Sequence, residues 1–141
     1  MNQYLTRLAT FALIAVAATG CSDTTSSSEV TGSYSAIIFS STGTSGQTNH
    51  LLAGSTFDIT LHSDGSTSGH LHMVTSSGAL DADMGGTWTQ SGDLVEFAQA
   101  ADTFVRDMVF RIERVGGNEF FLVGDQIFSG TRINVTLGRD T

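Results

Sequence analysis

Residues 56–73, TFDITLHSDGSTSGHLHM, decide the fold class, because apolar and polar residues alternate along both arms of the stretch. In an extended chain, successive side chains point to opposite faces, so each arm presents one apolar and one polar face. A three-residue loop over 64–66 would pair Ile59 with Leu71 and bring the two apolar faces together. The stretch therefore predicts an antiparallel β-hairpin with one face on a core and the other in solvent.

Segments of the same kind recur from Val30 onward, and none shows convincing helical periodicity. They are short, rich in Val, Ile, Phe and Thr, and separated by clusters of Gly, Ser, Asn and Asp. Two longer gaps, 41–49 and 76–84, are Gly/Ser-rich or acidic, and we expect them to be loops at an open end. The expected strands are 31–40, 50–62, 68–75, 85–90, 93–99, 107–115, 119–124 and 131–138.

This even spacing with short turns predicts an all-β fold, an antiparallel up-and-down meander of about eight strands closed into a small barrel. Closure removes the sheet edges that would otherwise pair with other chains. Within the meander, a two-residue turn at 91–92 would set Trp88 opposite Val95. A transmembrane barrel is disfavoured, because most strands are shorter than the roughly 9–11 residues it needs and outward positions hold charges such as Asp58 and Arg111.

The N-terminus carries the pattern of an exported protein. Arg7 is followed by an apolar run over 8–18, which is too short to cross a bilayer but has the length of a signal-peptide core. The run ends at Ala18-Thr19-Gly20-Cys21, and Cys21 is the one cysteine of the chain. Small residues directly before a cysteine resemble the lipobox of bacterial lipoproteins.

That resemblance implies three segments. Residues 1–20 would be a lipoprotein signal peptide, residues 21–29 an acylated cysteine with a flexible tether, and residues 30–141 the barrel domain. Acyl chains, palmitate among them, would anchor Cys21 in a membrane at about 0.8 kcal/mol per buried CH₂. In Gram-negative lipoproteins an Asp after the cysteine indicates the inner membrane. Ser22 stands there in this chain, which implies the outer membrane, facing the periplasm.

Charge and composition exclude several function classes. The formal net charge is −8, and loss of Arg7 with the signal peptide would make it more negative still. Such a surface repels phosphate backbones, so we expect no nucleic-acid partner. The six basic residues are all arginine, which leaves no lysine for Schiff-base chemistry or for a phosphate-binding loop. With Cys21 acylated no disulfide can form, and the fold depends on packing and backbone pairing.

Over about residues 30–140 the pattern resembles the lipocalin-like, or calycin, group of small barrels. The residues that carry the resemblance are Gly32-Ser33-Tyr34, Leu61-His62-Ser63-Asp64-Gly65, Gly86-Thr87-Trp88, Gly92-Asp93 and Arg139. Lipocalins have Gly-x-Trp on the first strand, and an arginine near the end of the barrel packs on that tryptophan. Here Tyr34 occupies the first-strand position, and the tryptophan, Trp88, stands in mid-chain. The resemblance implies ligand binding inside the barrel.

We therefore expect a lipid-anchored protein whose barrel binds a small apolar or amphipathic ligand without catalysis or a cofactor, driven by hydrophobic burial. An alternative is a filled barrel that works by its surface, as an envelope scaffold or protein-interaction module. No nucleophile, base and orienting group stand out together, so we do not expect an enzyme. The expected lining of the ligand site is Tyr34, Phe57, Ile59, Trp88, Phe97 and Phe110.

His70 and His72 form a second candidate site. Strand alternation places both on one face, and the loop over 64–66 sets Asp58 opposite His72. Two imidazoles with a carboxylate on the neighbouring strand could bind Zn²⁺ or Cu²⁺. The alternative is a solvated polar face, since these residues point away from the core. The acidic run 81–83 is interpreted as a solvent-exposed loop, because two carboxylates are too few for a specific Ca²⁺ site.

Overall fold

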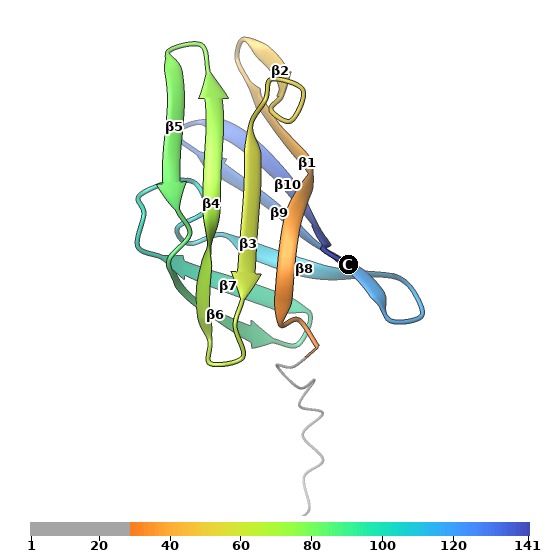
Figure 1. Cartoon of the computed structure of the whole chain (residues 1–141). Helices are drawn as coiled ribbons and strands as arrows, with labels where there is room; N and C mark the ends of the chain where they lie inside the picture. Colours follow the sequence, from red (N-terminus) through yellow and green to blue (C-terminus); the bar gives the residue numbers. More distant parts are fainter. Residues whose placement is uncertain (1–28) are drawn as a thin grey trace, which may run out of the picture.

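The computed structural model describes residues 29–141 as a single antiparallel β-barrel, and this part of the chain contains no helix (Figure 1). The signal peptide expected at 1–20, the acylated Cys21 and most of the expected tether lie outside the described residues. The strands are β1 (Gly32–Gly43), β2 (Gly46–Asn49), β3 (Thr56–Leu61), β4 (Ser66–Thr75), β5 (Gly78–Asp83), β6 (Gly86–Ser91), β7 (Leu94–Gln99), β8 (Val109–Gly116), β9 (Glu119–Phe128) and β10 (Thr131–Arg139).

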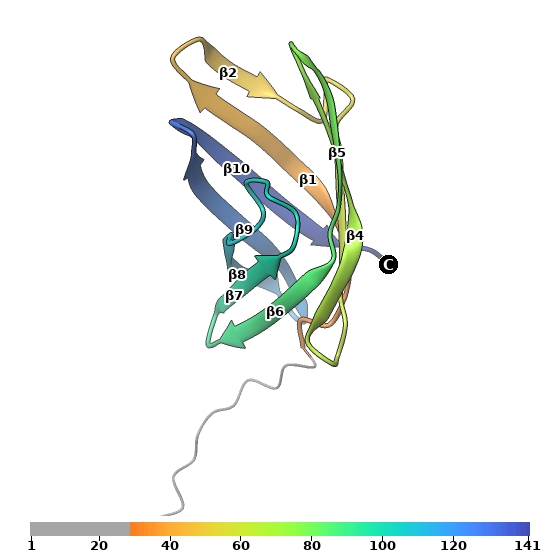
Figure 2. The same cartoon turned by 90° about the vertical axis from the view of Figure 1, so that its left-hand side faces the viewer.

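Pairing of β10 with β1 closes the sheet into a ring, which confirms the predicted fold class. The ring runs β1-β3-β4-β6-β7-β8-β9-β10, and β2 and β5 lie outside it as hairpin partners of β1 and β4. Both extra strands lie at the same end of the molecule, which we call the open end, at the top of Figures 1 and 2. The stretches 41–49 and 76–84, expected as loops, are therefore mainly strands. Neither stretch has the alternation that marks a half-buried strand, because β2 and β5 pair with the parts of β1 and β4 that extend past the core.

The β3–β4 hairpin has the predicted loop length but not the predicted register. His62 and Ser66 pair across a loop over 63–65, one residue earlier than expected, with Gly65 in the left-handed region at φ 83°. Ile59 therefore lies opposite Gly69 rather than Leu71. The expected register was wrong because Gly69 has no side chain, so an apolar alternation pattern cannot show that it, rather than Leu71, lies opposite Ile59.

The β6–β7 turn is also shifted by one residue. Its two central residues are Gly92 and Asp93, and Trp88 lies opposite Phe97 rather than Val95. Gly92 has φ 60°, a conformation that glycine adopts without the steric cost that other residues pay. The turn therefore forms where the glycine can occupy its first central position.

The core fills the ring from the strands and from one long connection. Between β7 and β8, residues 100–108 fold inward and bury Phe104, Val105 and Met108 at 3% exposure or less. The Phe104 ring lies 5.4 Å from the ring of Phe39 on β1, measured between centroids. The barrel interior near the open end is thus occupied by side chains of this loop.

The opposite end, which we call the closed end, is sealed by Arg139. Its guanidinium lies 5.6 Å from the centre of the Tyr34 ring and 5.2 Å from that of Phe120. The same group donates hydrogen bonds to the carbonyls of Glu29 (2.6 Å) and Thr31 (2.5 Å). Tyr34 therefore takes the place of the first-strand tryptophan under a C-terminal arginine, and the barrel is compatible with a calycin-like fold.

Glu29, expected at the end of the flexible tether, belongs to this closed end. Its carboxylate forms an ion pair with Arg114 on β8. That pairing lowers the pKa of Glu29. Across residues 29–141, no helix is long and apolar enough to cross a membrane.

Candidate ligand-binding site

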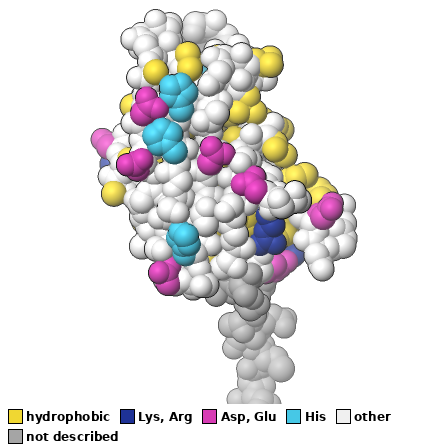
Figure 3. Space-filling view, viewed as in Figure 1, with side chains coloured by type: hydrophobic (Ala, Val, Ile, Leu, Met, Phe, Trp, Pro, Cys, Tyr) yellow, Lys and Arg dark blue, Asp and Glu magenta, His cyan; other side chains and the backbone are white. Residues whose placement is uncertain are grey.

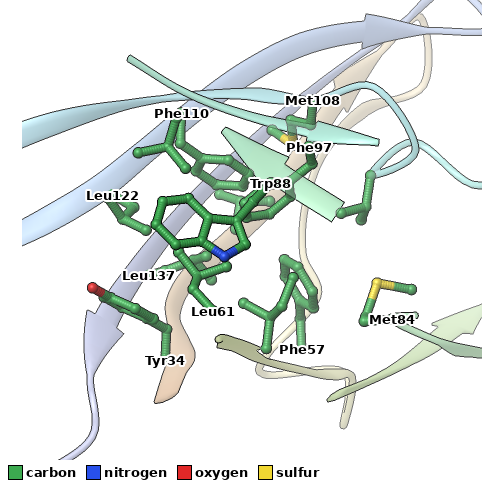
Figure 4. Packing of buried hydrophobic residues seen from close by; sticks show 14 of the residues in the cluster. Tyr34, Phe57, Leu61, Met84, Trp88, Phe97, Met108, Phe110, Leu122 and Leu137 are labelled. Atoms are coloured by element: carbon green, nitrogen blue, oxygen red, sulfur yellow. The ribbon is translucent and has the colours of Figure 1, made fainter. Parts of the chain in front are cut away.

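The six residues expected to line a ligand site are all buried in the barrel, as the alternation predicted. Figure 4 shows Tyr34, Phe57, Trp88, Phe97 and Phe110 among the core side chains. They also pack on one another: the rings of Phe97 and Phe110, for example, have centroids 4.9 Å apart. The indole N–H of Trp88 donates to the His62 carbonyl at 2.9 Å, which fixes the ring near the β3–β4 turn. Tyr34, Phe57, Ile59, Trp88, Phe97 and Phe110 are each 5% exposed or less.

A groove of about 510 Å³ lies at the open end, within the range typical of small-molecule sites. It runs between the β1–β2 hairpin, the end of β4 and the β9–β10 turn. None of the six residues expected to line the ligand site borders this groove. The groove is lined by Ser41, Thr48, His50, Ala53, Met73, Val74, Thr75, Ser76, Phe128, Ser129, Thr131 and Ile133.

The groove walls combine apolar and hydroxyl side chains. Met73, Val74, Phe128 and Ile133 supply apolar surface, while serines and threonines supply hydroxyl groups from β1, β2, β4 and β10. No Asp, Glu, Lys or Arg lines it. A second hollow, of about 310 Å³, lies at the closed end. Unlike the groove, it is lined by charged side chains, those of Glu119 and Arg139.

His50 is the most buried polar residue of the groove, at 5% exposure. Its backbone N–H donates to the Phe39 carbonyl at 2.8 Å, and its ring packs on the Phe39 ring with centroids 4.7 Å apart. Nε2 lies 2.7 Å from Oγ of Ser41, whereas Nδ1 is buried and has no partner at hydrogen-bond geometry. Burial lowers the pKa of His50, partly opposed by the nearby backbone of Val74, so the ring is neutral at pH 7.

Leu52 and Ile127 are the two most exposed large apolar side chains of residues 29–141. Leu52 is 87% exposed and Ile127 is 73% exposed. Leu52, in the turn before β3, directly precedes the groove-lining Ala53. Ile127 lies opposite Arg132 on the outer face of the sheet, so it is not part of the groove. An exposed apolar side chain such as Leu52 next to a concave site is typical of surfaces that bind other molecules.

The histidines of β4 do lie on one outward face, but with different partners from those expected. Asp58 is opposite His70, not His72, because of the register shift in the β3–β4 hairpin. Instead, Asp81 of β5 contacts both rings, 3.2 Å from His70 Nε2 and 2.7 Å from His72 Nδ1, and the aspartates surround them on this face (Figure 3). Over residues 29–141, no group of three or more His, Cys, Asp or Glu has the arrangement of a metal site.

These contacts change the titration of His70 and Asp81. Hydrogen bonds to Asp81, and then to Asp83 at 3.3 Å, raise the pKa of His70. Contacts with His72 and His70 lower the pKa of Asp81. The run 81–83, interpreted as an acidic loop, is thus part of β5, and its carboxylates accept hydrogen bonds from the histidine rings.

Comparison with protein family models, with curated proteins and with solved structures gave no match for this chain. Its function is therefore argued from the groove itself. Sequence reasoning missed the groove because its residues come from strand ends and turns, where alternation stops. The one available signal was Leu51-Leu52, an apolar pair outside the alternation pattern.

Proposed function

We propose that this protein binds a small apolar or amphipathic molecule, without catalysis, in the groove at the open end of its barrel. The observation that carries the proposal is the groove of about 510 Å³, with apolar surface from Met73, Val74, Phe128 and Ile133 and with Leu52 exposed next to the groove-lining Ala53. Burying those surfaces against a ligand removes apolar area from water, which favours binding by roughly 25 cal/mol per Å².

The groove replaces the expected site among the six inward residues. Those side chains already pack in the core, and a ligand among them would have to displace Phe97 from Phe110. A ligand in the groove needs no such repacking. In this proposal the six residues support the site by holding the barrel wall rigid.

The location of the protein is part of the same proposal. An acylated Cys21 would anchor the chain in the outer membrane facing the periplasm, with the residues after it as a tether. The barrel begins at Glu29, at the closed end, and the strand ends that line the groove lie at the other end of the barrel in Figure 1. The groove of the anchored protein would then open away from the membrane. Mass spectrometry of the protein extracted from its membrane should show the acyl chains on Cys21, and an unmodified Cys21 would contradict this part.

A second candidate is a protein-interaction role for the outer wall. A bulge in β1 between Ala36 and Ile38 leaves Ile37 and Ile38 half exposed on this wall. These side chains are apolar surface that a partner protein could cover. Loss of a co-purifying protein in an Ile38→Asp variant would favour this role.

Two experiments test the binding proposal. Native mass spectrometry of the full chain, released from its host membrane with an amphipathic polymer in place of detergent, should show an adduct of constant mass that leaves on denaturation. A Met73→Asp variant should lose the adduct, because it places a charge in the apolar wall, whereas Leu94→Asp on the outer wall should keep it. A bare polypeptide mass for the wild-type chain would contradict the proposal. So would hydrolysis of a simple ester that disappears in Ser41→Ala, since it would make the groove catalytic.

A further inference from the structure

We infer that the groove selects ligands with an uncharged head group that carries a hydroxyl or amide, and that Ser41, positioned by His50, is its principal polar contact. This inference rests on the proposed binding function and names the class of ligand. It is argued from three features of the described residues: the absence of charge in the groove, the Ser41–His50 hydrogen bond, and the distribution of hydroxyl groups on the walls.

The first feature separates the groove from the rest of the molecule. The chain has a formal net charge of −8, yet none of the groove-lining residues is Asp, Glu, Lys or Arg. An anionic head group would find no cation there, and it would also meet the negative field of the whole protein. A cationic head group would leave water for a groove that offers no carboxylate. Neither ion is matched, whereas an uncharged head group has no such cost.

The second feature is the hydrogen bond that positions the Ser41 hydroxyl against the His50 ring. His50 is neutral and buried, so one ring nitrogen carries the proton and the other accepts. Where Nδ1 carries the proton, Nε2 accepts a hydrogen bond from the Ser41 hydroxyl at 2.7 Å. The lone pairs of Ser41 Oγ then remain for a donor on the ligand. In the other tautomer Nε2–H donates to Ser41, and the serine proton remains free for the ligand.

A hydroxyl or amide group satisfies Ser41 in either tautomer, because it can both donate and accept. A carboxylate only accepts and an ammonium only donates, so each is matched to one tautomer at most. The His50 ring is held in place because it packs on the Phe39 ring, with the two ring centroids 4.7 Å apart. Ser41 is thus a fixed polar contact beside an apolar wall.

The third feature is the position of the other hydroxyl groups. Thr48, Thr75 and Thr131 reach the groove from three different strands, and Met73, Val74 and Ile133 supply the apolar surface between them. A ligand with an apolar tail and a hydroxyl head can therefore bury the tail against the apolar wall and keep its head hydrogen-bonded.

Three probes with the same ten-carbon tail test the inference: decan-1-ol, decanoate and decylammonium. Binding to the full chain at pH 7 is measured by calorimetry, with the ring nitrogens of His50 followed by ¹⁵N NMR. We expect decan-1-ol to bind at least tenfold more tightly than either ion, and the His50 ring signals to shift on binding while remaining those of a neutral imidazole.

Ser41→Ala should reduce the preference for the alcohol to threefold or less. Ser40→Ala is the matched control, because the neighbouring side chain on β1 points to the opposite face of the strand and does not line the groove. His50→Phe keeps the ring packing on Phe39 but removes both nitrogens, and it should act like Ser41→Ala. Amide spectra establish that each variant keeps the wild-type fold.

The outcomes separate this inference from the function it rests on. If none of the three probes binds, the binding function itself is contradicted. If all three bind with similar affinity, or decanoate binds most tightly, the function stands and the selectivity is wrong. If the preference for the alcohol survives both Ser41→Ala and His50→Phe, the role assigned to Ser41 is wrong.

Discussion

At the scale of single residues, Arg139 shows how one side chain can close a barrel. It stacks on Tyr34 and Phe120 and donates to two carbonyls of the segment that enters the barrel. An ammonium group can replace the charge but not the flat face or the several fixed donors of a guanidinium. Lysine is therefore a poor substitute at this position.

We expect Arg139→Lys to lower the free energy of unfolding by about 1–2 kcal/mol, through loss of ring stacking and of charged hydrogen bonds. Denaturation by urea measures the change. Arg132→Lys on the same strand is the control, since Arg132 forms an exposed ion pair with Asp125 and its replacement should cost less. Equal effects of the two substitutions would contradict a special role for Arg139.

Gly69 is the residue at which the β3–β4 register depends on the absence of a side chain. A Cβ at this position would lie 2.1 Å from the carbonyl oxygen of Asp58, and φ is +145°. Backbone cannot move aside as a flexible side chain can, so we expect Gly69→Ala to cost about 2–4 kcal/mol of folding free energy. Thermal or urea unfolding measures this loss.

Gly78 is the comparison that separates the cost of backbone strain from the cost of a steric clash with a neighbouring strand. Its φ is +132°, but a Cβ there would meet nothing within 4 Å. Gly78→Ala should therefore cost only the conformational strain, about 1 kcal/mol. If Gly69→Ala proves no more destabilising than Gly78→Ala, close approach of β3 is not the reason for the glycine.

At the scale of strands and hairpins, the sequence predicted the direction of side chains better than their pairing. Apolar alternation identifies which residues face inward, and Phe57, Ile59 and Leu61 are all buried as expected. Pairing depends on where a turn forms, and Gly65 and Gly92 determined that by their positive φ angles. Several Ser, Asp and Gly residues near each turn allowed neighbouring registers, so the pattern could not choose between them.

Two strands could not be predicted from alternation at all. β2 is exposed along its whole length and β5 along most of it, because both extend hairpins beyond the core. Such strands are stabilised by backbone hydrogen bonds and by pairs of side chains across the strands, which leave no apolar period in the sequence. The groove lies among these strand ends, and for that reason it too was missed.

The β4–β5 hairpin should be sensitive to pH through His70. Its folded pKa is raised above the ordinary value near 6.5, so its contribution to stability is present below that value and is lost as pH rises through the folded pKa. The pKa of Asp81 is lowered, so its contribution is present above the ordinary value near 3.8 and is lost as pH falls through the folded value. The two contributions overlap from about pH 4 to pH 6.5.

NMR titration of the histidine rings tests this assignment. We expect the pKa of His70 to lie above 6.5 in the wild-type chain and to fall toward it in Asp81→Asn. Asp58→Asn is the control, because Asp58 is opposite His70 on β3 without a hydrogen bond to it. A His70 pKa that is unchanged in Asp81→Asn would show that β5 does not hold the ring.

At the scale of the whole molecule, the ring is not equally strong along every strand pair. β1 and β10 pair over most of their length, from Tyr34 with Arg139 to Thr42 with Arg132. β4 and β6 share two register pairs, Ser66 with Thr87 and Thr67 with Gly86, because β4 then leaves β6 to pair with β5. The closed barrel was predictable from even strand spacing, whereas this weak point was not, because it follows from the unpredicted β5.

Side chains compensate for the short pairing between β4 and β6. The hydroxyl of Thr67 donates to the Met84 carbonyl at 3.0 Å and accepts from the Gln99 amide at 3.0 Å. Thr67 and Gln99 are 7% and 5% exposed, so these hydrogen bonds are shielded from water. They connect β4, β7 and the β5–β6 connection at the point where the backbone pairing is shortest.

We therefore expect Thr67→Val to destabilise the barrel by about 1–3 kcal/mol, since it leaves the buried Gln99 amide without its partner. Amide hydrogen exchange should increase first along β4 and β6 and least along β1 and β10, because the ring opens where pairing is shortest. Thr60→Val is the matched control, because Thr60 shares an exposed hydroxyl contact with Ser33, and we expect a change within about 0.5 kcal/mol. Uniform exchange in Thr67→Val would mean that the ring unfolds as one unit and that the β4–β6 pair is not its weak point.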